Sequence, residues 1–346
     1  MKTSQVIAML ILPLLLSAGV YSCKKNRFKK EVFLEELYQY KIEPEIRETA
    51  TSIVTGINSW EIYSTDMNEV SLSNFKSNFT VLMNKYESVS FYNLGDVGAT
   101  YVFSRMYKTT IDTVGIIENY NSQDEFTKSD IGTYTNTERG IFALEYLLFS
   151  PTLEDSLESI KFVGFVEAHL QYLESVSADF ASTWNIYQQN FINNNEGGVT
   201  DSYNIVVNRI IHVLEDLIVK RISKPVAEND PSIGVGYHSN RSLQNIKTQL
   251  IQLNEIYLGT GTEDFNSVYN NVRKKNRNLA DDVTDKFEEI ISYGNSMSYE
   301  LAYYITSDQI TLEAYSDLLI ELLGLFKIDV QQELDIILTF GDTDGD

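Results

Sequence analysis

The chain has 346 residues, of which 43% are hydrophobic, and this is enough apolar material for one large or two ordinary globular domains. Its net charge of −22 argues against a nucleic-acid partner, because binding to phosphates requires basic patches. The single cysteine excludes a disulfide framework and a zinc site built from cysteines.

The N-terminal residues have the pattern of an export signal. Lys2 precedes the apolar segment Val6–Leu16, and small residues then lead to Cys23. This pattern is similar to a bacterial lipobox and predicts that residues 1–23 are a lipoprotein signal peptide, with Cys23 as the lipidated first residue of the mature protein. A transmembrane anchor is the alternative, although the segment is shorter than the roughly 20 apolar residues that span a bilayer. Residues 24–30 form a basic tether that lies near anionic headgroups or is a solvated linker.

Apolar residues recur at three- and four-residue spacing through most of the remaining chain, and no run alternates as a strand would. The sequence therefore predicts an all-α fold. The segment Asn193–Gly198, rich in Asn and Gly, is the best internal boundary. We expect two antiparallel helical-bundle domains packed side by side, with residues 31–195 in the first and residues 196–346 in the second.

The predicted elements can be given in chain order. The expected helices are Glu31–Trp60 with Pro44 at a helix start, Leu72–Ser90, Tyr101–Tyr120, Leu153–Phe191, Asp201–Ile222, Ser242–Leu258, Asp264–Val272, Asn276–Tyr293 and Ser307–Phe340. The expected loops are Asn93–Gly98, Asn121–Asn136 and Ser223–Asn240. We expect Ser242 to cap its helix and Gly259 to end it.

The stretch Ile141–Phe149 differs from the other predicted helices because it is apolar on every side and carries one charge, Glu145. Such a helix is expected to be buried, with Thr137 as a candidate cap. An unpaired carboxylate is costly to bury. Glu145 therefore either makes a structural hydrogen bond or ion pair, or belongs to a functional site, where buried carboxylates have raised pKa values.

This stretch also carries a family resemblance. The sequence GIFALEYLLF resembles the signature helix of the imelysin family, a family of exported proteins classed with the peptidases, whose hallmark is Gly-x-His-x-x-Glu before a large apolar run. Gly140 and Glu145 match this hallmark, and Phe142 stands in the position of the histidine. Leu325–Asp346 is similar to the C-terminal signature of the family, so the resemblance spans the chain from about Glu31 to its end.

The resemblance implies an all-α fold of two bundle-like domains, with a candidate site near their interface that includes Gly140, Phe142 and Glu145. It also implies an exported protein of the bacterial cell envelope, facing the periplasm or held at the outer membrane, and a link to iron uptake. In the family motif, His and Glu share one helix face and could bind one zinc or iron ion. In this chain Phe142 cannot be a ligand, and we assign no catalytic residue.

Iron is the candidate metal, and Glu145, His212 and Glu215 are its candidate ligands. His212 and Glu215 form a His-x-x-Glu pair on the polar side of the predicted helix Asp201–Ile222, where they face the other domain or solvent. We expect His169 to flank the packing seam of its helix and His238 to lie in a mobile surface loop. The tail with Asp342, Asp344 and Asp346 is expected to be an acidic terminus, since it lacks the remaining ligands of a calcium loop.

Three functions are compatible with these observations. The first is a membrane-anchored, non-enzymatic binding component in iron or haem uptake, with a partner protein in the envelope. The second is an imelysin-type metallopeptidase that uses Glu145 as one metal ligand. The third is a helical adaptor with a degenerate site, in which Phe142 and Glu145 are core residues and Glu145 pairs with an Arg, Lys or Tyr.

Overall fold

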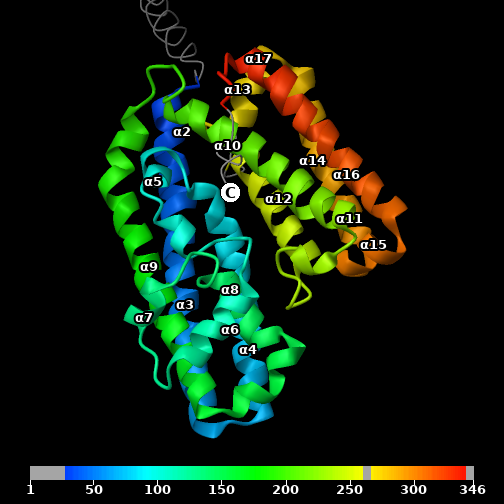
Figure 1. Cartoon of the computed structure of the whole chain (residues 1–346). Helices are drawn as coiled ribbons and strands as arrows, with labels where there is room; N and C mark the ends of the chain where they lie inside the picture. The colour runs from blue at the N-terminus through cyan, green and yellow to red at the C-terminus, as the bar shows by residue number, and fades with distance from the viewer. Residues whose placement is uncertain (1–27, 260–265, 340–346) are drawn as a thin grey trace, which may run out of the picture.

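Helices provide all the regular secondary structure in residues 28–259 and 266–339, the parts of the chain that the computed structural model describes (Figure 1). The predicted all-α fold is therefore confirmed. The α-helices are α2 (Lys30–Leu37), α3 (Glu43–Asp66), α4 (Glu69–Val89), α5 (Gly95–Ala99), α6 (Thr113–Ser122), α7 (Lys128–Thr133), α8 (Ile141–Phe149), α9 (Ile160–Asn193), α10 (Ser202–Asp216), α11 (Lys224–Glu228), α12 (Ser242–Leu258), α13 (Val268–Lys275), α14 (Arg277–Ser296), α15 (Leu301–Ser307), α16 (Gln309–Gly324) and α17 (Gln331–Leu334). None of these helices combines the length and the apolar character needed to cross a membrane.

The helices up to α9 gather on one side of the molecule, and those from α12 onward gather on the other (Figure 1). On the first side α3 packs against α4 and α9, and on the second α14 packs against α12 and α16. Contacts of α12 with α4 join the two sides, and α10 contacts both α2 on the first side and α16 on the second. The buried apolar side chains accordingly form one connected core. The division into domains at residue 195 stays a prediction.

Two tryptophans anchor the long helices of the first side. The indole of Trp60 on α3 donates a hydrogen bond to the carbonyl oxygen of Val163 at 3.2 Å, and that of Trp184 on α9 donates to the carbonyl oxygen of Tyr92 at 3.1 Å. Both rings are almost fully buried. Because each buried N–H has a partner, these large rings add apolar contact area without leaving an unpaired donor.

The longest predicted element is two helices rather than one. A 3-10 helix covers Pro151–Glu158, and α9 begins only at Ile160. Ser159 between them has extended backbone (φ −83°, ψ 126°). The predicted helix Leu153–Phe191 was therefore wrong in its first turns, although its apolar spacing continued across the break.

The predicted helix Tyr101–Tyr120 was wrong over its first half. Tyr101 has a φ of 55°, and only a short 3-10 turn follows at Phe103–Arg105. Helix α6 then begins at Thr113, where the side chain of Asp112 accepts a hydrogen bond from the Gly115 amide at 2.9 Å. This local cap and a run of β-branched residues before it compete with a continuous helix.

All three predicted loops contain short helices, which are too short to show an apolar period. Helix α5 occupies most of Asn93–Gly98, α7 lies within Asn121–Asn136, and α11 and the 3-10 turn Pro231–Ile233 lie within Ser223–Asn240. Helix α7 has a reciprocal cap, in which the Thr127 side chain and the Asp130 side chain each accept from the other's backbone amide. That Thr-x-x-Asp spacing is the signal by which α7 could have been found.

Several helices run on through π-helical turns. Tyr38–Ile42 joins α2 to α3, with Pro44 in the first turn of α3 as predicted, and Leu217–Ser223 joins α10 to α11. A third π turn, Leu325–Val330, joins α16 to α17. Such turns often mark functional sites, because they re-aim side chains within an otherwise regular helix.

Helix α12 has the predicted bounds but not the predicted cap. It begins at Ser242, and Arg241 holds the capping position without a side-chain hydrogen bond. Gly259, with a φ of 80°, ends the helix as expected.

Candidate functional site

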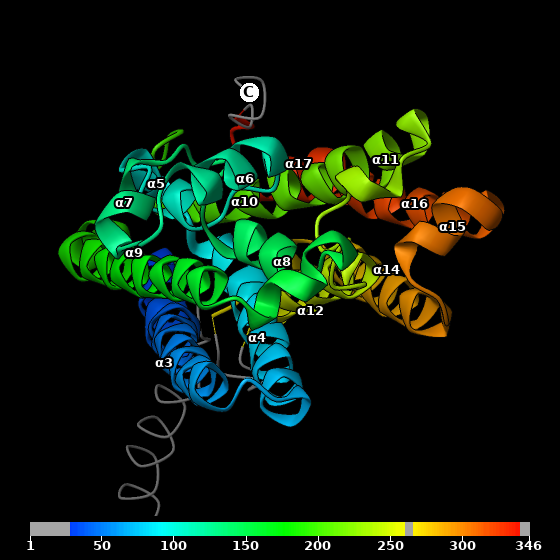
Figure 2. The ribbon, with the colours of Figure 1, turned by 60° about the horizontal axis from the view of Figure 1, so that its bottom comes forward.

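Helix α8 carries the motif and lies above α4 near the middle of the view in Figure 2. It begins after Gly140, whose φ is 89° and whose ideal Cβ would lie 2.7 Å from the carbonyl oxygen of Met106. The same oxygen accepts a hydrogen bond from the Ile141 amide at 2.9 Å. A glycine is needed here for both conformation and space. Thr137 is not the cap that we predicted, and its carbonyl instead accepts a hydrogen bond from the Asp112 amide.

Glu145 is buried, with 2% of its surface exposed. Its Oε1 accepts hydrogen bonds from the Ser239 amide at 2.8 Å and from the Ser239 hydroxyl at 2.7 Å. Burial raises the pKa of Glu145 to about 7, although the two bonds from Ser239 act in the opposite direction. The buried carboxylate is thus hydrogen-bonded, and it changes its charge near neutral pH.

The segment before α12 covers the end of this site. His238 lies between the rings of Tyr146 and Tyr237, with centroid distances of 5.1 and 5.3 Å. The side chain is half-buried, and this burial lowers the pKa of His238. The expectation of a mobile surface histidine was wrong, because this loop packs its His against α8 and places the neighbouring Ser239 on Glu145.

Phe142 replaces the motif histidine and is buried. Its ring meets the ring of Tyr107 edge to face, with 5.2 Å between the centroids. This geometry is a favourable aromatic pair. The position that carries a potential ligand in the family motif therefore makes an apolar contact here. The far end of Tyr107, its hydroxyl, belongs to a buried polar network.

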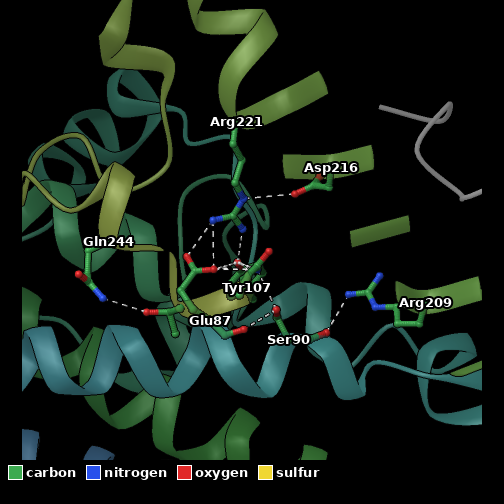
Figure 3. A network of polar contacts seen from close by, with 9 residues as sticks. Glu87, Ser90, Tyr107, Arg209, Asp216, Arg221 and Gln244 are labelled. Carbon is green, nitrogen blue, oxygen red and sulfur yellow. Dashed lines mark hydrogen bonds and ion pairs between the residues drawn. The ribbon is translucent and has the colours of Figure 1, made fainter. Parts of the chain in front are cut away.

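This network centres on Glu87 of α4 and Arg221 of the π turn (Figure 3). Arg221 Nη1 lies 3.1 Å from Glu87 Oε2, and both side chains are at most 3% exposed. The Tyr107 hydroxyl donates to Glu87 Oε2 at 2.8 Å and accepts from Arg221 Nη2 at 2.6 Å. Gln249 Nε2 also donates to Glu87, and Arg221 Nε lies 3.3 Å from Asp216. Such charges are tolerated in the interior because each has several partners.

The surroundings fix the charge states in this network. Burial opposes the charge on Arg221, but Glu87, Tyr107 and Asp216 together raise the pKa of Arg221 well above its usual value. Burial also raises the pKa of the Tyr107 hydroxyl. The arginine is therefore a fixed cation, paired with Glu87 and Asp216, and the tyrosine is a neutral hydroxyl.

A cavity of about 670 Å³ opens beside the network. Its walls come from α5, the irregular segment after it, α10, the π turn and α12, and they include Tyr107, Arg209, His212, Asp216, Arg221 and Gln249. The sequence predicted one residue of this cavity, His212, but not the buried pair beside it, since Glu87 and Arg221 lie 134 positions apart. The one available signal was an acidic residue, Glu87, on the apolar face of a predicted helix.

The three candidate metal ligands have separate partners. His212 lines the cavity, and its Nε2 lies 2.8 Å from the carbonyl oxygen of Thr339. Glu215 pairs with Lys327, whereas Glu145 is held by Ser239. Within residues 28–259 and 266–339, no group of three or more His, Cys, Asp or Glu side chains could hold a metal ion. The described residues therefore do not bring Glu145, His212 and Glu215 together as one group of ligands.

The remaining predicted features lie in the core or outside the described residues. His169 is buried among aromatic rings, 4.7 Å from that of Phe165, and burial lowers its pKa to about 3. Cys23, residues 24–27 of the basic tether and the acidic tail with Asp342, Asp344 and Asp346 lie outside the described residues.

Comparison with known proteins places these observations in a family. The model of the imelysin family matches residues 58–309. An imelysin-like protein from Psychrobacter arcticum 273-4 has a similar structure, with a TM-score of 0.73, 15% identity, and coverage of 90% of this chain and 97% of that chain. A protein from Parabacteroides distasonis ATCC 8503, named as an iron-regulated protein A precursor, has a TM-score of 0.73, 12% identity and the same coverage. No curated protein matches the chain.

Proposed function

Because the chain belongs to the imelysin family, we propose that it is a non-enzymatic binding component of iron or haem uptake, anchored by lipid in the bacterial cell envelope. The iron-regulated name of one structurally similar protein supports a link to iron for that protein, and we extend the link to this chain. The lipobox-like sequence that ends at Cys23 supports the anchor.

One observation carries the proposal of binding rather than catalysis. Phe142 stands where the family motif has histidine, and its ring packs on Tyr107 instead of offering a ligand or a proton. Tyr107 also lines the cavity, whose volume lies in the range of about 300–1,000 Å³ typical of small-molecule sites. The motif helix thus supports the wall of a cavity through an aromatic contact.

The form in which iron would bind follows from the side chains at the cavity. The cavity wall contains cations and hydrogen-bonding groups, whereas the described residues offer no cluster of metal ligands. We therefore propose that iron is bound as a complex with an organic ligand, or as haem, and not as a bare ion. An envelope protein of iron uptake would be the partner that delivers or receives this complex.

The test uses soluble protein that starts at residue 24. Calorimetric titrations with ferrous ion, ferric citrate and haemin measure binding, and digestion of casein with and without EDTA measures peptidase activity. We expect saturable binding of ferric citrate or haemin, weaker binding of the bare ion, and no cleavage that EDTA inhibits.

The alternatives give different results. Casein cleavage that is inhibited by EDTA and lost in Glu145→Gln would establish a metallopeptidase and overturn the proposal. Absence of binding to all three iron forms would leave the helical adaptor as the function.

A further inference from the structure

The wall of the cavity has the opposite charge to the protein as a whole. The chain carries a net charge of −22, yet the charged residues that line the cavity are Lys108, Arg209, Lys220 and Arg221 with one acidic residue, Asp216. Asp216 lies close to two of these cations, 3.3 Å from Arg221 and 3.6 Å from Lys220, and Arg221 is also paired with the buried Glu87. Cations that line a concave site on an acidic protein attract anions to it, because low-dielectric walls focus the field.

Arg209 is the cation best placed to meet such an anion. Its side chain donates to the carbonyl oxygen of Ser90 at 2.8 Å (Figure 3) and to that of Phe91 at 3.3 Å. No carboxylate of the described residues lies within ion-pair distance of it, although the residue is partly buried. The two backbone oxygens hold the guanidinium in place. Burial lowers the pKa of Arg209, and Asp216 acts in the opposite direction from beyond ion-pair distance. A fixed guanidinium recognises planar carboxylate groups well, as it does phosphate, because its N–H donors match their oxygens.

Gln249 supplies a second and independent feature. The residue is 5% exposed and lines the cavity, and its Nε2 donates to Glu87. Its Oε1 is buried and has no hydrogen-bond partner among the described residues. A buried acceptor without a donor is costly, so a ligand that brings a hydroxyl group would be stabilised here.

We infer that the cavity binds a small hydroxycarboxylate, with a carboxylate on Arg209 and a hydroxyl that donates to Gln249. Leu94, Phe103 and Tyr107 add apolar wall for the carbon skeleton of the ligand. The inference rests on the proposed function, because it names the class of organic ligand that would carry iron into this site.

The experiment titrates the soluble protein with citrate in the absence of iron, followed by calorimetry. Tricarballylate is the matched ligand, since it has the three carboxylates of citrate without the hydroxyl, and inorganic phosphate is the general anion. Arg209→Gln removes the cation, and Arg277→Gln, on the exposed surface of α14, makes the same change of charge far from any site. Lys220→Gln alters an exposed cation at the cavity and keeps the test valid if Arg209→Gln unfolds.

We expect citrate to bind saturably and about fivefold more tightly than tricarballylate, for one added hydrogen bond. Arg209→Gln should weaken citrate binding about tenfold or more, as for loss of a charged hydrogen bond. Lys220→Gln should weaken it about threefold. Arg277→Gln should leave it unchanged.

Several results would overturn the inference. Absence of citrate binding would overturn it. The proposed function would still be supported if haemin bound in the earlier titration. Equal affinity for phosphate and citrate would replace the hydroxycarboxylate with a general anion. Equal loss in Arg209→Gln and Arg277→Gln would show attraction to overall charge only. Citrate binding that ferric ion does not strengthen would support the inference and count against the iron role.

Discussion

At the scale of single residues, Glu145 makes the stability of the protein depend on pH. The pKa of Glu145 is about 7 in the folded protein and 4.5 in the unfolded chain, where the carboxyl group is in water. At a pH between 4.5 and about 7, the folded state therefore retains a proton that the unfolded state has lost. The stabilisation from this protonated group is complete below pH 4.5 and is lost as the pH rises to about 7.

Glu145→Gln should therefore remove part of the pH dependence. Between pH 4.5 and pH 8 the wild type should lose on the order of 3 kcal/mol more unfolding free energy than the variant, from the 1.36 kcal/mol per pKa unit. Urea unfolding at both pH values measures this difference, with the exposed Glu313→Gln as the control. An identical pH dependence in wild type and Glu145→Gln would contradict the raised pKa.

Phe142→His restores the family hallmark and tests the position directly. His at this position and Glu145 would share a helix face, three residues apart. The variant should be less stable than wild type by on the order of 1–3 kcal/mol, because a polar ring replaces an apolar one in the core. Zinc at a hundred times its Kd should raise the unfolding free energy of this variant by about 2.7 kcal/mol.

Thermal unfolding with and without zinc measures both effects of Phe142→His. The double variant with Glu145→Gln should lose the zinc response, and wild type should show none. If zinc stabilises the single and the double variant equally, then residues 142 and 145 do not act together.

The sequence predicted the burial of some of these residues but not their partners. One charge in an apolar run predicted the burial of Glu145, because that pattern is local. Its partner Ser239 lies 94 positions away, and nothing in the local sequence of either residue identifies the other. The same holds for the pairing of Glu87 with Arg221, which depends on how distant helices pack.

At the scale of elements, the start of α8 depends on Gly140. Gly140→Ala should destabilise the protein by about 2 kcal/mol or more, since the new Cβ would meet the Met106 carbonyl and the φ of 89° would be strained. Gly164→Ala, in the second turn of α9 with nothing within 4 Å of its Cβ, should stabilise by about 0.5–1 kcal/mol. Urea unfolding compares the two, and a similar cost in both would show that Gly140 is not constrained.

Elements with a long apolar period were predictable, and short or irregular ones were not. Helices α4, α12 and α14 have close to their predicted bounds, and α9 has close to its predicted C-terminal end, because each repeats its apolar residues over several turns. The segment from Tyr101 to Asp112 failed because its backbone is set by contacts such as that of Met106 with α8. The π turn that orients Arg221 was not predicted either, because the spacing of the apolar residues does not reveal it.

At the scale of the whole molecule, the predicted lipid at Cys23 decides where the protein resides. Cys23→Ser should release the full-length chain from membranes, because lipidation at that residue is the proposed anchor. Partition of the expressed protein between the aqueous and detergent phases of Triton X-114 measures this change. Wild type should enter the detergent phase and the variant the aqueous phase. Retention of Cys23→Ser in the detergent phase would indicate a transmembrane anchor at Val6–Leu16 instead.

The central claim is that the cavity beside the Glu87–Arg221 pair is the binding site of this protein. Hydrogen–deuterium exchange of the soluble protein, with and without ferric citrate, tests it most directly. We predict slower exchange in the two cavity-lining segments, residues 93–109 and 208–221, and no change in α14 and α16. Protection confined to other parts of the chain, or no protection at a saturating concentration of ferric citrate, would contradict the account.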